Sequence, residues 1–171
     1  MSSVFQSSFL ILAVGFVVTS GATLTGQDTP MKPPKEFQEL MRSNTKIVAV
    51  DGPGGPATGS ITDALVAGQE NFEAIYKDSA ALRENFVKIE AFFTVNKFGD
   101  ALDHAKAASA AIADMQRWAS DGVWNYGNKA LTDKISLEIQ RAQLSLATTC
   151  RNCHITHRVH VLTSPLTHEI R

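Results

Sequence analysis

Apolar residues recur at helical spacing along most of the chain from residue 35 to residue 161. The clearest repeat lies between residues 63 and 95, where inward positions alternate steps of three and four: Phe72, Ile75, Ser79, Leu82, Phe86, Ile89 and Phe93. Such steps place side chains on one face of an α-helix, as in the interior of an antiparallel bundle. The pattern predicts one long helix, and a break near Gly68 would move its start several residues later.

The same periodicity predicts three further helices, at about 35–50, 99–120 and 129–161. Pro33 and Pro34 suit the position just before the first of them, and the glycine- and proline-rich run 51–56 ends it. Asp121 and Gly122 are expected to end the helix that begins at residue 99.

The segment Ser60-Ile61-Thr62-Asp63 resembles a capping box, which would make Ser60 the N-cap of the long helix after it. No segment reads as a strand. We therefore expect an all-α fold, an antiparallel up-down-up-down four-helix bundle. Residues 35–161 form its single domain and residues 162–171 a tail, because 171 residues suffice for one hydrophobic core.

The first thirty residues differ from the rest of the chain. An apolar run extends from Phe9 to Val18, small residues follow, and no charged side chain precedes Asp28. This pattern is typical of a secretory signal peptide spanning residues 1–22 and cleaved after Ala22, with a polar segment at 23–34. A bilayer-spanning helix needs about 20 apolar residues. We therefore favour cleavage over an anchor and expect an exported protein without stable membrane insertion.

The two cysteines of the chain both lie in Cys150-Arg151-Asn152-Cys153-His154. The pattern Cys-x-x-Cys-His is the attachment signature of a c-type haem. Thiols three residues apart lie on one face of a helical turn, so each can add across one vinyl group of the same porphyrin. The histidine that follows can bind the iron through an imidazole nitrogen. The sequence therefore predicts one covalent haem c.

Three other interpretations of the motif stay open. A zinc site needs four ligands, and His157 or His160 would have to supply the fourth. A thioredoxin-like dithiol normally opens a helix after a strand, whereas this motif comes near the end of a helical stretch. A disulfide between the two cysteines would close a very short loop. Export of the chain favours haem, because c-type haem is attached outside the bacterial cytoplasm.

Phenylalanines gather at one end of the predicted bundle. There the end of the last helix lies beside the start of the first, the end of the second and the start of the third. These regions hold Phe37, Phe86, Phe92, Phe93 and Phe98. Each could be ordinary core packing, but together they favour a large apolar ligand at the end that carries the motif. The tryptophans and Tyr126 fall at the opposite end.

A four-helix bundle with Cys-x-x-Cys-His near its C-terminus resembles the class II c-type cytochromes, the cytochrome c-prime family and its low-spin relatives. Arg158 fits that family's pattern of an arginine four residues after the haem histidine. The resemblance implies that Cys150 and Cys153 carry the thioethers and that His154 is the proximal iron ligand. It also implies that Arg158 lies beside that imidazole and the porphyrin; a surface arginine is the alternative.

The resemblance also places a residue of the first helix over the other face of the iron. Low-spin members have a methionine there, which here corresponds to Met41; a core methionine is the alternative. In the gas-binding members an apolar residue blocks the iron, and Leu40 would take that place. Phe37 stands where the family often has an arginine, so the alignment of the first helix with the family could shift by one residue. The resemblance also implies that Phe37 contacts the haem.

These expectations imply a periplasmic one-electron carrier with redox proteins as partners, and not an enzyme. The alternative is a five-coordinate protein that binds nitric oxide or carbon monoxide. The chain carries 16 basic and 17 acidic residues, a net charge of −1, which argues against a nucleic-acid partner. An arginine excess in residues 140–171 suits an acidic redox partner or the haem propionates. A homodimer stays open.

Histidines outside the motif are expected mainly at the surface: His157, His160 and His168, although His157 is close enough to the motif to contact the porphyrin. His104 is expected either at the surface or near the haem edge.

Overall fold

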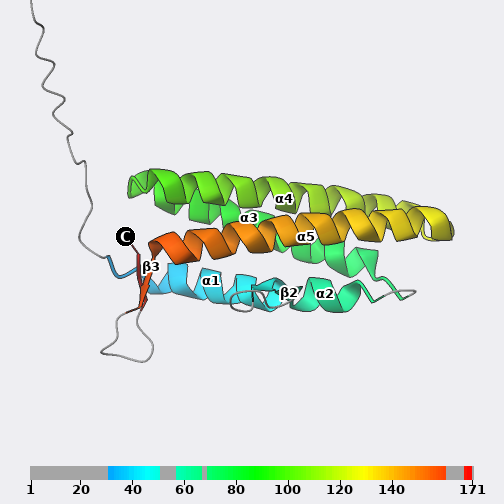
Figure 1. The fold of residues 1–171 in the computed structure, drawn as a ribbon, viewed down its shortest axis with the longest axis horizontal. Helices are drawn as coiled ribbons and strands as arrows, with labels where there is room; N and C mark the ends of the chain where they lie inside the picture. Colours follow the sequence, from blue (N-terminus) through cyan, green and yellow to red (C-terminus); the bar gives the residue numbers. More distant parts are fainter. Residues whose placement is uncertain (1–30, 51–56, 67–68, 161–167, 171) are drawn as a thin grey trace, which may run out of the picture.

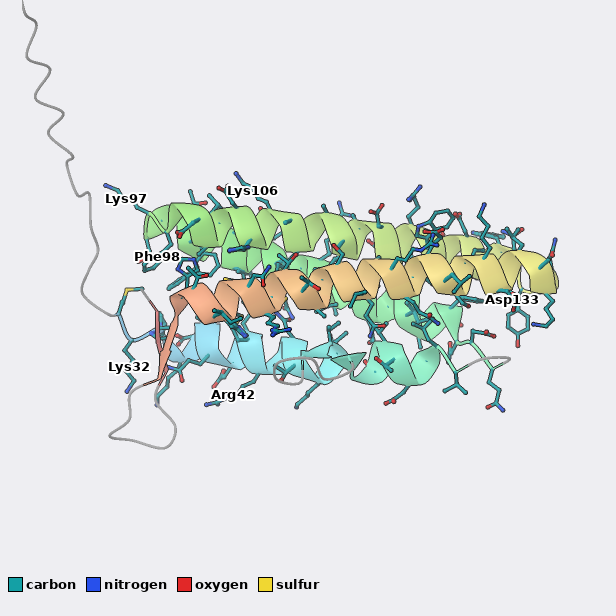
Figure 2. All side chains as sticks on the ribbon, in the orientation of Figure 1. Lys32, Arg42, Lys97, Phe98, Lys106 and Asp133 are labelled. Carbon is teal, nitrogen blue, oxygen red and sulfur yellow. The ribbon has the colours of Figure 1, made fainter. Side chains whose placement is uncertain are left out.

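Three long helices form the body of the protein: α3 (Phe72–Val95), α4 (Gly99–Trp124) and α5 (Lys129–His157). They pack antiparallel, α3 against α4 and α4 against α5, in an all-α arrangement consistent with a helical bundle (Figure 1). Charged side chains project outward from them, such as Lys106 on α4 and Asp133 on α5 (Figure 2). The computed structural model describes residues 31–50, 57–66, 69–160 and 168–170.

Two shorter helices, α1 (Lys35–Ile47) and α2 (Ser60–Ala64), lie one after the other along the long helices (Figure 1). Both contact α3. The expected start of α1 is confirmed, because Pro34 directly precedes its first residue. Its buried residue is Phe37, which packs into the core at one end of α3.

The interior of α3 is the best-predicted part of the fold. All seven residues of its step-of-three-and-four repeat are buried. On α4 the buried residues include Ala105, Ile112, Met115 and Ala119, together with three further alanines: Ala101, Ala108 and Ala111. Alanine has no side chain beyond Cβ, so α4 can lie close to both of its neighbours. Ile135, Ile139 and Leu146 continue the core along α5.

Gly122 lies inside α4, so the prediction that Asp121-Gly122 ends this helix is wrong. The helix continues to Trp124, and Gly122 is buried against the aromatic ring of Phe72. A Cβ atom at Gly122 would lie 2.5 Å from Phe72 Cγ, a separation that no side chain tolerates. The glycine therefore serves close packing between α3 and α4, and does not break the helix.

The predicted capping box at Ser60 is also wrong. Ser60 is the first residue of α2, and Gly59, with a φ of 109°, precedes it as the cap. The Ser60 hydroxyl instead donates a hydrogen bond of 2.5 Å to Asp78 Oδ2 on α3. The long helix begins only at Phe72, where the Asn71 side chain accepts a hydrogen bond from the Ala74 amide. The expected helix from residue 63 is therefore divided into α2 and α3.

Two short antiparallel strand pairs contradict the expectation that no segment forms a strand. One joins β1 (Ala49–Val50) to β2 (Ala57–Thr58), and the other joins β3 (Arg158–His160) to β4 (His168–Ile170). The strands are two or three residues long, too short for a visible alternation of apolar and polar positions. They shorten two predicted helices, because α1 ends at Ile47 and α5 at His157.

The predicted signal peptide at residues 1–22, the polar segment 23–30, the helix-ending run 51–56 and part of the predicted tail lie outside the described residues. Within the described ranges, no helix combines the length and apolarity that crossing a bilayer requires.

Candidate functional site

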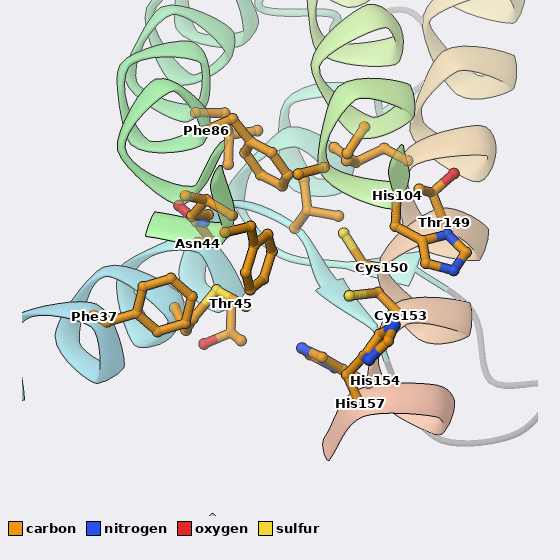
Figure 3. Close-up of a pocket in the computed structure, with 18 of the residues that line it drawn as sticks. Phe37, Asn44, Thr45, Phe86, His104, Thr149, Cys150, Cys153, His154 and His157 are labelled. Atoms are coloured by element: carbon orange, nitrogen blue, oxygen red, sulfur yellow. The ribbon is translucent and has the colours of Figure 1, made fainter. Parts of the chain in front are cut away.

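A cavity of about 350 Å³ lies between α1 and one end of the three long helices (Figure 3). Its walls come from four helices. Phe37 and Met41 line it from α1, Phe86 and Phe93 from α3, and His104 from α4; the last turns of α5 line the remaining side. Its volume falls within the range of small-molecule pockets, about 300 to 1,000 Å³. The aromatic end predicted from the sequence is therefore hollow.

The aromatic wall is built by contacts between rings. The Phe37 ring lies 4.2 Å from that of Phe92 and 5.7 Å from that of Phe93, measured between centroids. Phe98, which caps the start of α4, makes an edge-to-face contact with Phe93 at 6.2 Å. Such contacts fix ring orientation beyond simple burial. Phe37 is thus both a core residue and a cavity wall.

Cys150 and Cys153 face the cavity from the end of α5, where Figure 3 shows both sulfur atoms pointing into the open space. Both are half-buried free thiols. Burial raises the pKa of Cys150 to about 12, with a smaller effect of neighbouring Cys153. Burial also raises the pKa of Cys153 to about 11, and the charge of Asp100 adds to that rise. The site therefore holds neutral thiols.

Neutral thiols argue against the dithiol interpretation, because catalytic Cys-x-x-Cys pairs depend on a lowered thiol pKa. The zinc interpretation finds no support either. In the described part of the chain, no three His, Cys, Asp or Glu side chains form a group that could hold a metal ion. The two sulfur atoms are not joined in a disulfide.

His154 lines the same cavity, directly after Cys153. His157, one turn further, is buried, with a relative exposure of 6%, so its expected surface position is wrong. Its Nε2 lies 3.3 Å from Asp100 Oδ2 at the start of α4, and its ring centroid lies 6.2 Å from that of His104. His104 also lines the cavity. Three imidazoles therefore gather at this wall.

On α1, Leu40 and Met41 are both half-buried against the core, and of the two only Met41 is among the residues that line the cavity. Arg158 is the first residue of β3 and not part of α5. Because α5 ends at His157, Arg158 does not lie one helical turn beyond His154 on the same helix. The predicted role of Arg158 beside the imidazole stays a prediction.

The structure thus brings Phe37, Met41, Cys150, Cys153 and His154 together around one space.

Polar residues of α1 line the cavity beside Met41, and sequence reasoning missed them. Asn44 and Thr45 follow Met41 by three and four residues, the spacing that places side chains on one helical face. The Asn44 Oδ1 accepts a hydrogen bond of 2.7 Å from Asn85 Nδ2 on α3. Arg42 is the one Lys, Arg, Asp or Glu among the described lining residues, and it extends to the outside of α1 (Figure 2). Helical spacing from Met41 could have identified Asn44 and Thr45.

Comparisons of the chain with protein-family models, with curated proteins and with solved structures found no match. The cavity combines apolar walls with two thiols and an imidazole at the end of α5 and a thioether on α1, so it offers sulfur and nitrogen donors beside an apolar space.

Proposed function

We propose that the chain is a class II c-type cytochrome that carries one electron at a time on a single covalent haem c in the periplasm. The observation that carries this proposal is the convergence of Cys150, Cys153 and His154 on one cavity at the end of α5. A Cys-x-x-Cys-His motif alone is a short pattern. Attachment of haem requires that both thiols and the histidine face one space, and an apolar space lined by aromatic rings suits the porphyrin.

The chain's own residues would divide the work as follows. Cys150 and Cys153 would each hold the ring to α5 through one thioether, formed by adding the S–H bond across a vinyl group. His154 would supply an imidazole nitrogen to the iron. Phe37, Phe86 and their neighbours would exclude water from the ring faces. Haem supplies a one-electron couple when bound, while the chain supplies attachment, ligation and burial.

The arrangement of helices supports the resemblance to the cytochrome c-prime family. In this proposal α1 and α2 together take the place of one helix, and with α3, α4 and α5 they complete a four-helix bundle with haem near the C-terminus. The division between α1 and α2 departs from a regular bundle. It begins at Val48, which lines the cavity, whereas α2 contributes no lining residue.

We further propose Met41 as the sixth iron ligand. It lines the cavity from α1 and His154 lines it from α5, whereas Leu40 is not among the lining residues. A methionine opposite a histidine raises the reduction potential and gives a low-spin carrier. The gas-binding alternative needs an open or blocked sixth position, and it remains an outcome of the experiment below.

The test is expression of the full chain with a c-type maturation system, followed by spectra of the purified protein. We expect covalent haem that survives denaturation and is lost in the double variant Cys150→Ser/Cys153→Ser. Wild-type protein without covalent haem would reject the proposed function.

Spectra of two methionine variants then identify the sixth ligand. Met41→Leu should convert a low-spin ferric spectrum to high spin. The control Met115→Leu changes a fully buried methionine that does not line the cavity, and it should leave the spectrum unchanged. A high-spin wild type that binds nitric oxide readily would favour the gas-binding alternative.

A further inference from the structure

Asp100 and His157 form a contact between the first turn of α4 and the last turn of α5. The His157 Nε2 lies 3.3 Å from Asp100 Oδ2, and the two side chains differ sharply in exposure, 8% for His157 against 70% for Asp100. The other carboxylate oxygen, Oδ1, accepts a hydrogen bond of 3.1 Å from the Ala101 amide. One oxygen is thus held by the backbone of α4, which directs the other toward the histidine.

The position of this contact links it to the attachment motif. His157 follows His154 by three residues, so both lie on the same side of the last helical turn, and both line the cavity. The Asp100 carboxylate is also close enough to Cys153 to raise the pKa of its thiol. The Asp100 carboxylate therefore lies near the wall that carries the motif, and its contact with His157 ties the end of α5 to α4 where α5 gives way to β3.

Building on the proposed function, we propose that Asp100 and His157 are a positioning pair that holds the attachment segment against α4 and lowers the reduction potential of the iron bound by His154. A fixed negative charge stabilises the oxidised state, which carries one more positive charge than the reduced state. Asp100 and His157 are not themselves oxidised or reduced. The electron passes between the iron and the redox partner. Solvent around Asp100 weakens this effect without removing it, since the side chain of His157, which the carboxylate contacts, is buried.

The experiment compares midpoint potentials of haem-loaded variants at pH 8 and low ionic strength. Asp100→Asn removes the charge with little change of shape, and Asp103→Asn removes an equal charge from the exposed face of the same helix. We expect Asp100→Asn to favour the reduced state about two- to fivefold, which corresponds to a rise of about 20 to 40 mV. Asp103→Asn should shift the potential much less, and Asp100→Glu should stay near wild type.

Different outcomes separate this inference from the proposed function. Wild-type chain without covalent haem rejects the function itself. Haem-loaded Asp100→Asn that shifts no more than Asp103→Asn overturns the inference alone. If Asp100→Asn fails to attach haem, attachment by Asp100→Glu supports the positioning role of the carboxylate, and failure of both variants overturns it.

A double-mutant cycle tests whether the two residues act as a pair. The cycle uses Asp100→Asn and His157→Gln, singly and together, with thermal unfolding of the haem-loaded protein as the measurement. Non-additive effects on the unfolding midpoint are expected for side chains in contact, and additive effects would overturn the pairing.

Discussion

Replacing Gly122 by alanine tests a contact between α3 and α4 that leaves no room for a side chain. Three ring atoms of Phe72 would lie 2.5, 2.6 and 2.8 Å from the new Cβ. Phe72 has a relative exposure of 3%, so its ring cannot move aside into solvent. The substitution must therefore displace the ring or separate the two helices.

Two effects of opposite sign decide how much the Gly122→Ala substitution changes the free energy of unfolding. Alanine is a better helix former than glycine by about 1 kcal/mol in a helix interior. Overpacking a well-filled core costs about 1 to 3 kcal/mol, and overlap with a rigid ring falls in the upper part of that range. We therefore expect Gly122→Ala to lower the free energy of unfolding by about 1 to 2 kcal/mol. That loss corresponds to about 2 to 8 °C in Tm for a domain of this size.

Gly99→Ala is the matched control, because Gly99 begins the same helix and a Cβ atom there would meet no packing neighbour within 4 Å. This control should be neutral or more stable by up to about 1 kcal/mol. Urea unfolding followed by far-ultraviolet circular dichroism measures both variants. If Gly122→Ala is as stable as Gly99→Ala, the close approach of α3 and α4 is refuted.

Three further predictions concern the cavity. Phe37→Ala should cost about 3 kcal/mol in urea unfolding, because it removes a buried ring stacked near Phe92; a loss under about 1 kcal/mol would show that the ring is not packed. In the haem-free chain at pH 8, Cys150 and Cys153 should react with iodoacetamide at least about tenfold faster in urea than in the folded protein. The reason is that folding raises the thiol pKa from 9.0 to about 12 for Cys150 and to about 11 for Cys153, and only the thiolate reacts. Equal rates in the two states would refute this prediction. Asn85→Ala should cost about 1 kcal/mol, because it removes the amide that donates to α1, and an unchanged unfolding curve would exclude that bond.

The interior of the long helices could be predicted because burial there follows a single period. In α3 every predicted inner position is buried, since the helix is covered along its whole length. Gly122 could not be interpreted in this way. Glycine commonly ends helices, and only the position of Phe72 on another helix shows that its lack of a side chain is used for packing.

The same limit applies to the helix ends and to the site. Ser60 has the residue type of an N-cap, but its hydroxyl reaches Asp78 instead, a partner 18 residues away in sequence. His157 looked like a surface residue because histidine at a helix end usually is one. Asp100 and the first turn of α4 bury it, and that neighbour is set by the packing of two helices. Periodicity indicates which face of a helix points inward, but it does not indicate which residue of a neighbouring helix packs against that face.

The division of the fold explains why the cavity lies where it does. α3, α4 and α5 bury continuous stripes against each other, whereas α1 has 13 residues and one fully buried side chain, Phe37. An isolated helix of that length is marginal in water, so α1 depends on what it packs against. Met41 and Asn44 on its inner face line the cavity, and Met41 also packs half-buried against the core. A ligand that filled this space would add contacts to α1 and would stabilise its docking beyond what Phe37 provides. If the proposed haem is that ligand, removing it should loosen α1 first, because α3, α4 and α5 keep the residues that they bury against one another.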